Sequence, residues 1–202
     1  MRRLCVFLWL LLAPAAFAEV DFDGTDDVII SDNDVTLLGA HQASFWIKPD
    51  TIGENNLGFI YRWCNNSRVN LIATNTIQVV LPTATPTIAR CNNNSITLGA
   101  WQHVVVNFNG GLTANRYHIY INGTECGYQL QQNGSGALIF CLAGLQKFRI
   151  GNNDLLTRTF DGQIGELAIW NSTALTAAER TLLGQPIKYL PQQVQPTALS
   201  WY

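Results

Sequence analysis

Charge is scarce in this sequence. Only 13% of its 202 residues are charged, and the formal net charge at pH 7 is -2. Proteins that bind nucleic acid or anionic membranes usually carry a basic surface, and this chain has no basic excess from which to build one. The 48% of hydrophobic residues is the composition of a packed globule, not of a disordered chain. We therefore expect a folded domain with no nucleic-acid partner.

Long apolar runs are also lacking after the first residues. The chain opens with two arginines, an apolar run over residues 4–12, a proline and the small-x-small sequence Ala16-Phe17-Ala18. These are the parts of a cleavable secretory signal, and the run is too short to span a bilayer comfortably. We predict that residues 1–18 are a signal peptide and that the mature chain begins at Glu19. The protein would then be secreted, periplasmic or on the cell surface, with no membrane span after cleavage.

Cysteine is sparse: Cys5 lies in the predicted signal, and the mature chain keeps Cys64, Cys91, Cys126 and Cys141. An even number of cysteines in an oxidising compartment favours disulfides, and zinc lacks the expected C-x-x-C or His-rich spacing. Four cysteines can pair in three ways, which the sequence alone does not decide. Because each pair flanks runs close in the chain, we expect bonds 64–91 and 126–141, with the other pairings left open.

Helical periodicity is almost absent, and short β-branched or aromatic runs replace it. They cover residues 44–47, 58–63, 69–73, 77–81, 101–108, 117–121, 137–142, 148–150 and 163–170. Asn122-Gly123 is a strong hairpin signal, because a type I′ turn needs positive φ at both central residues. Turns at this spacing, without alternating βα units, are typical of an antiparallel sandwich. One short helix is expected after Thr176, which forms a capping box with Glu179.

Five segments in chain order resemble the laminin G-like, concanavalin A-like lectin and glucanase family. They are residues 20–28, residues 43–49, the W-x-H-V strand at residues 98–106, the hairpin at residues 120–123, and the closing strand and helix at residues 160–179. The resemblance implies a jelly-roll sandwich of two antiparallel sheets, one of them concave and facing a ligand. We predict such an all-β domain over residues 19–185, and a proline-containing tail over 186–202 that acts as a linker or surface strap.

The predicted ligand site lies where a strand runs into a polar loop. Trp63 ends the run, Asn65 and Arg68 follow, and Tyr61 faces the same side as Trp63 because strand side chains alternate. An aromatic beside amides and a guanidinium is a plausible ligand rim. The alternative is a tryptophan that only covers its own sheet. The other strand tryptophans, Trp46, Trp101 and Trp170, are expected in the core.

Aspartates gather between residues 21 and 34. Calcium is a hard cation that prefers oxygen ligands, so Asp23 and Asp26 form a candidate calcium site. The EF-hand template does not match, and Gly165 stands where the resembled family often has an aspartate. The alternative is a turn of solvated acids.

Catalytic motifs are missing as well. The sequence contains no G-x-S-x-G, H-E-x-x-H or phosphate-loop motif. Glucanases of the resembled fold use carboxylates spaced as E-x-D-x-x-E, whereas the comparable strand here carries Glu166 alone, and one carboxylate cannot act as both acid and nucleophile. We predict a secreted, non-enzymatic binding or adhesion module with a glycan or cell-surface glycoprotein as partner. The alternatives are a degenerate or partial glycoside hydrolase and a structural spacer of a longer surface protein.

Overall fold

The structure is a computed structural model. It describes residues 19–34, 40–63, 67–82, 84–110, 117–135, 147–171, 175–185, 191–194 and 199–200. The predicted signal, the strand expected over residues 137–142, Asn65, Cys64 and Cys141 lie outside the described residues.

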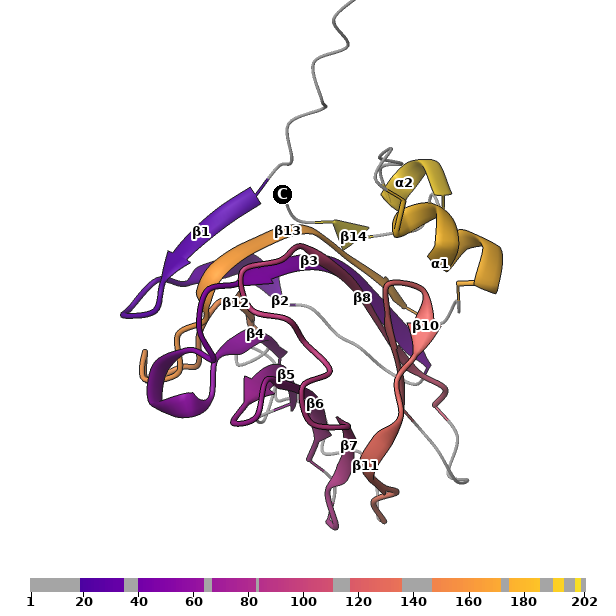
Figure 1. The fold of residues 1–202 in the computed structure, drawn as a ribbon, viewed down its shortest axis with the longest axis horizontal. Helices are drawn as coiled ribbons and strands as arrows, with labels where there is room; N and C mark the ends of the chain where they lie inside the picture. Colours follow the sequence, from indigo (N-terminus) through magenta and orange to yellow (C-terminus); the bar gives the residue numbers. More distant parts are fainter. Residues whose placement is uncertain are drawn as a thin grey trace, which may run out of the picture.

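The chain folds into two antiparallel sheets that pack face to face, with sheet A arching over sheet B (Figure 1). Sheet A contains, in spatial order, β1 (Glu19–Asp23), β13 (Asp161–Asn171), β3 (His41–Pro49), β8 (Gln102–Phe108), β9 (Tyr117–Ile121) and β10 (Thr124–Glu125), and β14 (Leu199–Ser200) also pairs with β13. Sheet B contains β11 (Tyr128–Gln132), β7 (Thr87–Cys91), β6 (Thr76–Leu81), β5 (Ser67–Ile72), β4 (Phe59–Trp63), β12 (Lys147–Ile150) and β2 (Ile29–Asp34). A 3-10 turn, η1 (Glu54–Asn56), precedes β4. The predicted jelly-roll sandwich is confirmed.

The core lies between the sheets because apolar residues alternate along the strands. Phe45 and Val104 are register partners in β3 and β8, and both are fully buried in the inter-sheet core. The neighbouring pair, Ser44 and Val105, faces the opposite side of sheet A, because successive strand residues point to opposite faces. Burying each large apolar side chain contributes roughly 1.5–3 kcal/mol to folding.

A second, smaller core covers the outer face of sheet A. Helix α1 (Ala177–Leu183) buries Leu183 there against Val105 and Trp170. The predicted capping box is present, since the Thr176 side chain accepts a hydrogen bond from the Glu179 amide and the Glu179 carboxylate accepts one from the Thr176 amide. Trp46 and Trp170 are buried as expected, and Trp101 is half-buried.

The tail expected as a linker or strap takes part in this outer core. Helix α2 (Pro191–Val194) places Val194 against the cluster that contains Trp170. Strand β1 pairs with residues 161–165 of β13, and β14 pairs with Ala168 and Ile169 on the same strand. Among the described residues, no helix is both long and apolar enough to cross a membrane.

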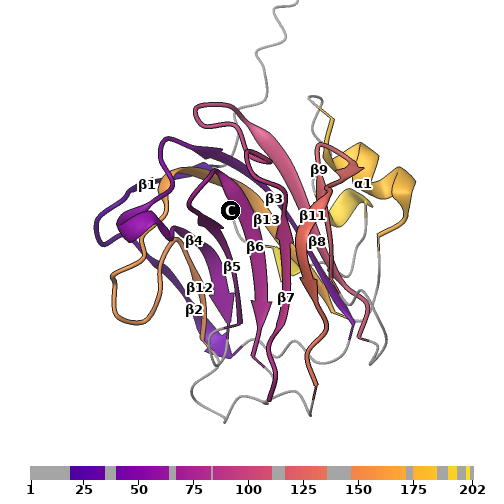
Figure 2. The same ribbon diagram turned by 60° about the horizontal axis from the view of Figure 1, so that its bottom comes forward.

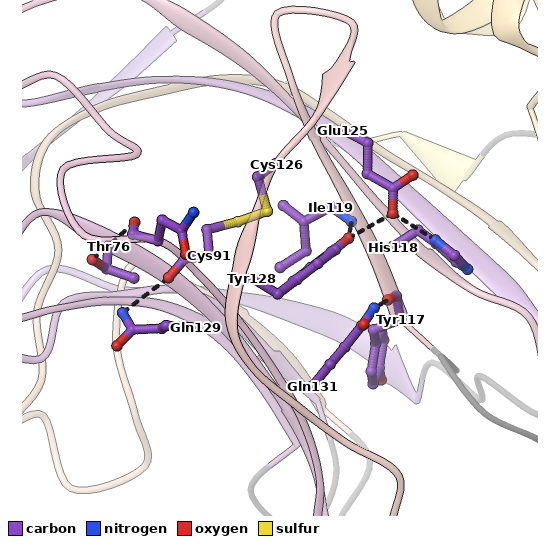
Figure 3. The surroundings of a disulfide bond; sticks show 11 residues. Thr76, Cys91, Tyr117, His118, Ile119, Glu125, Cys126, Tyr128, Gln129 and Gln131 are labelled. Atoms are coloured by element: carbon purple, nitrogen blue, oxygen red, sulfur yellow. Dashed lines mark hydrogen bonds and ion pairs between the residues drawn. A yellow bond between two sulfur atoms is a disulfide. The ribbon is translucent and has the colours of Figure 1, made fainter.

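The disulfide prediction is wrong for both expected pairs. Cys91 is bonded to Cys126, with 5.7 Å between their Cα atoms (Figure 3), so neither cysteine is available to Cys64 or Cys141. Cys91 ends β7, and Cys126 follows β10. Strand β11 pairs with β7 with Tyr128 opposite Cys91, which brings Cys126 to the end of β7. The order of the strands in the sheet decided which cysteines form the disulfide. Closeness in the chain had predicted different pairs.

Candidate functional site

The outer face of sheet B carries a ladder of polar side chains. Its inner face supplies core residues such as Val69, Leu71 and Val79, so the alternate positions point outward. Figure 2 brings this side forward, with β12, β4, β5, β6 and β7 side by side. The outward residues on these strands include Arg149, Arg62, Arg68, Asn70, Gln78 and Arg90.

Three arginines form one row across adjacent strands. Arg149 of β12 is the register partner of Arg62 in β4, and Arg62 is the register partner of Arg68 in β5. Neighbouring strands lie about 4.8 Å apart, so these side chains start close together. Like charges directly opposite one another destabilise a sheet. We call Arg62, Arg68 and Arg149 the arginine row.

One carboxylate bridges two members of the row. Asp154 Oδ2 lies 2.5 Å from Arg62 Nη1, and Asp154 Oδ1 lies 2.7 Å from Arg149 Nε. The Asp154 side chain is 53% exposed and belongs to the loop between β12 and β13. That loop is held by its own side chains: Asn153 Oδ1 accepts a hydrogen bond from the Thr157 amide, at 2.9 Å. Asp154 therefore presents its carboxylate from a structured turn.

Arg68 is a half-buried member of the arginine row and lies over an aromatic ring. Its guanidinium carbon lies 5.6 Å from the ring centroid of Phe59, within the range of a cation–π contact. Burial, and then the positive charge of Arg62, lower the pKa of Arg68 from its ordinary value. The sheet thus holds two like charges against each other where water is partly excluded.

A second row combines amides with another arginine. Asn70, Gln78 and Arg90 are successive register partners across β5, β6 and β7. Arg90 donates two hydrogen bonds to Gln78 Oε1, at 2.9 Å from Nε and 2.6 Å from Nη2. Asn70 donates to the Leu71 carbonyl at 3.1 Å, while its buried Oδ1 accepts no hydrogen bond from the described residues. Asn70 and Gln78 are buried, so Arg90 is the half-exposed group that this row adds beside the first.

The predicted site residues fall on two different faces. Tyr61 and Trp63 do share a face, but it is the core: they are 1% and 3% exposed, and the Tyr61 ring stacks on Trp63 at 5.6 Å and on Phe148 at 5.3 Å. Burial raises the pKa of Tyr61 well above its ordinary value. Neither ring can form a ligand rim, whereas Arg68 lies on the outer face.

Sequence reasoning missed the other members of the outer face. A signal was available, since Arg62 stands between Tyr61 and Trp63, and a polar residue that alternates with aromatic ones faces away from them. Arg149 and Asp154 carried no comparable signal, because only the register of β12 on β4 sets Arg149 beside Arg62.

The acidic turn after β1 gathers three carboxylates. Oxygens of Asp23, Asp26 and Asp27 lie within 4.8 Å of one another, which adds Asp27 to the two residues named from the sequence. Part of this geometry serves the turn itself. Asp27 accepts a hydrogen bond from the Asp23 amide at 2.9 Å, and Asp23 accepts one from the Thr25 amide at 2.8 Å. The remaining oxygens are of the type that calcium prefers.

A family model agrees with this architecture. The model of the concanavalin A-like lectin/glucanases superfamily matches residues 22–179. The chain belongs to this superfamily. No curated protein matches the sequence.

Solved structures with the superfamily's sandwich show the same fold. A heptameric pentraxin from Limulus polyphemus is 18% identical with a TM-score of 0.53, and the alignment covers 90% of each chain. The CBM40 of the Ruminococcus gnavus IT-sialidase, bound to α2,3 sialyllactose, is 11% identical with a TM-score of 0.56 and covers 83% of this chain and 98% of its own. Domain 4 of a Geobacillus stearothermophilus arabinanase, in complex with arabinotriose, is 22% identical with a TM-score of 0.52 and covers 76% of this chain and 70% of its own.

The superfamily includes glucanases. If this chain were a glycoside hydrolase, Glu166 would be its candidate catalytic carboxylate. It lies at the β-bulge of β13 with φ of 51°, in sheet A. It lines a cavity of about 10 Å³ whose other lining residues are Val20, Phe22, Ile29, Ile150, Ile164, Gly165 and Leu167. None of these supplies the second carboxylate that glycoside hydrolysis needs. Glu166 is also on a different sheet from the polar ladder.

Proposed function

We propose that the mature chain is an extracellular, non-catalytic module that binds a glycan on the outer face of sheet B. The observation that carries this proposal is the strand register, which sets the half-exposed guanidinium groups of Arg149, Arg68 and Arg90 on one face from β12 to β7. Sugar hydroxyls accept hydrogen bonds, and guanidinium groups donate them. The expected contacts are hydrogen bonds, because Phe59, the aromatic residue that lies beside Arg68, is buried.

The other outer face is less suited to a ligand. Over sheet A, Leu175, Leu183 and Val194 pack against Trp170 and so cover that part of the sheet. Two of the solved neighbours, the sialidase module and the arabinanase domain, are structures with a bound sugar. A disulfide that joins segments of different sheets is compatible with export to an oxidising compartment.

A glycan array probed with the mature chain, residues 19–202, tests the proposal. For the best-bound glycan, Arg90→Ala should weaken binding by about tenfold in calorimetry, since a hydrogen bond to a charged group contributes roughly 1.5–3 kcal/mol. Lys48→Ala is the control, because it removes one positive charge from β3 of sheet A.

The array, together with an assay for released reducing sugar, distinguishes the proposal from its alternatives. A folded domain that binds no glycan would support the structural-spacer alternative. Release of reducing sugar by the wild type, abolished in Glu166→Gln, would support the hydrolase alternative and contradict the non-catalytic assignment.

We also propose that the acidic turn binds calcium through Asp23, Asp26 and Asp27. The convergence of their oxygens within 4.8 Å supports this. Calcium should then raise the melting temperature of the wild type, because a ligand that binds only the folded state stabilises it. Asp26→Asn should lose most of that increase, and magnesium should produce a smaller one. Equal melting temperatures with calcium and with chelator would contradict the proposal.

A further inference from the structure

We infer that the Cys91–Cys126 disulfide is a redox-sensitive switch at one edge of sheet B. While the bond is oxidised, β11 stays paired with β7. When a dithiol reduces the bond, β11 separates from β7 and the rest of the sandwich stays folded. The inference goes beyond the proposed function and does not depend on any ligand. It is carried by the packing of β11, by its hydrogen bonds and by the burial of the two cysteines.

Strand β11 lies at the end of sheet B and adds little to the core. Among the described strands it pairs with β7 alone, and its register shifts between Tyr128 and Leu130. No residue of β11 is buried, whereas every residue of β6, on the other side of β7, is buried. Tyr128 packs against the inter-sheet core only in part. Segments with few buried apolar contacts are the ones that open locally while the rest of a protein stays folded.

Polar contacts hold the side chains of β11 (Figure 3). Gln129 donates hydrogen bonds to the Cys91 carbonyl and to Asn93 Oδ1, each at 2.9 Å. Gln131 donates one to the Tyr117 carbonyl at 3.1 Å. When the strand leaves, water replaces these partners, so each bond shifts the opening equilibrium by only about fivefold. Such contacts alone hold a strand weakly.

The disulfide adds a covalent link between the start of β11 and the end of β7. Cys91 ends β7, and Cys126 lies two residues before β11 begins at Tyr128. The Gly127 carbonyl between them accepts a hydrogen bond from the Asn92 amide at 2.8 Å. The bond keeps the Cα atoms of the two cysteines 5.7 Å apart, so Tyr128 stays opposite Cys91. Reduction removes this constraint and leaves β11 to its polar contacts.

The two cysteines differ in their access to a reductant. Cys91 is fully buried, whereas Cys126 is half-buried between the exposed residues Glu125 and Gly127. A thiolate of the dithiol therefore attacks Cys126 Sγ, and the electron pair of the S–S bond leaves with Cys91 Sγ, which takes up a proton. The second thiol of the reductant then attacks the mixed disulfide and releases Cys126 as a thiol. The protein gains two electrons and two protons, and the dithiol becomes a disulfide.

Hydrogen–deuterium exchange of the mature chain, residues 19–202, tests the switch with dithiothreitol as the dithiol. After reduction, the amides of β11 and the β7 amides that face it should exchange about tenfold faster than in the oxidised protein. The amides of β6 and β8 should keep their rates, because these strands lie in the buried part of the sandwich. Chymotrypsin should cleave after Tyr128 or Leu130 in the reduced protein and spare both sites in the oxidised one.

Three variants assign the response to this bond. Cys91→Ala/Cys126→Ala should show the fast exchange of β11 without reductant, and reductant should change it no further. Cys64→Ala/Cys141→Ala is the matched control, because it removes the other two cysteines of the mature chain and should keep the full response. Gln129→Ala removes two of the polar contacts, so it should speed the exchange of β11 about fivefold more in the reduced protein.

The outcomes that would overturn the switch are distinct. Unchanged exchange of β11 in a chain whose thiols are all titratable would show that the polar contacts suffice without the bond. Equal acceleration in every strand, with loss of the circular dichroism signal, would show that the bond supports the whole fold. A response to reductant that persists in Cys91→Ala/Cys126→Ala would assign it to other cysteines and contradict the inference.

Discussion

At the scale of single residues, His103 shows how burial changes chemistry. The structure places its ring at 1% exposure. Its Nε2 lies 2.8 Å from Ser44 Oγ, and Gly184 at the end of α1 leaves room for its Nδ1. Burial lowers the pKa of His103 from 6.5 to about 4. A ring so enclosed cannot contact a ligand, and it is neutral at physiological pH.

This burial predicts how stability depends on pH. Between about pH 6.5 and pH 4, the unfolded chain binds a proton at His103 and the folded chain does not, so the free energy of unfolding falls as the pH is lowered through this window. We expect a loss of about 2 kcal/mol between pH 7 and pH 5 from this group. Urea unfolding at the two pH values measures it.

Two variants make the assignment to His103 specific. His103→Gln should make the free energy of unfolding depend less on pH, because it removes the group that gains a proton on unfolding. His118 is paired with Glu125 near the surface. His118→Gln should therefore keep the pH dependence of the wild type. The same slope in His103→Gln and wild type would show that another group is responsible.

At the scale of elements, the passage from β10 to β11 joins the two sheets. Cys126 is bonded to Cys91, and two residues later the Tyr128 hydroxyl accepts a hydrogen bond from the Ile119 amide of β9 at 2.8 Å (Figure 3). Tyr128 itself pairs with β7 of sheet B. A covalent link and a hydrogen bond thus connect sheet A and sheet B at the same place.

Loss of this disulfide should be costly. The bond closes a loop of 35 residues, for which the reduced entropy of the unfolded chain corresponds to about 3–4 kcal/mol. The double variant Cys91→Ala/Cys126→Ala should lose about that much in urea unfolding. A non-reduced digest should yield the peptide pair that contains Cys91 and Cys126. A digest in which Cys91 is linked to Cys64 would refute this pairing.

At the scale of the whole molecule, the two outer faces of the sandwich differ. Sheet A carries α1, α2 and β14 near its outer side, and sheet B presents polar strands (Figures 1 and 2). The apolar residues beneath α1 make a small second core, whereas the ladder on sheet B contains arginines and amides. This asymmetry is why the proposed ligand face is on sheet B.

Much of this organisation could be predicted from local patterns. The β-branched run over residues 102–108, the Asn122-Gly123 turn and the capping box at Thr176 each depend on residues close in the chain, and each feature is present in the structure. The order of five family-like segments likewise predicted the sandwich that the family model confirms. Local sterics and hydrogen bonding determine such features before distant segments meet.

The candidate site depended on contacts between distant segments. Alternation showed that Tyr61 and Trp63 share a face, but only the packing of sheet A over β4 made that face the core. The arginine row required β12 to pair with β4, and the disulfide required β11 to pair with β7. The sequence by itself determined the strands, their turns and the fold class. The tertiary structure decided which side of each strand is buried and which side chains meet, because both depend on partners that are far apart in the chain.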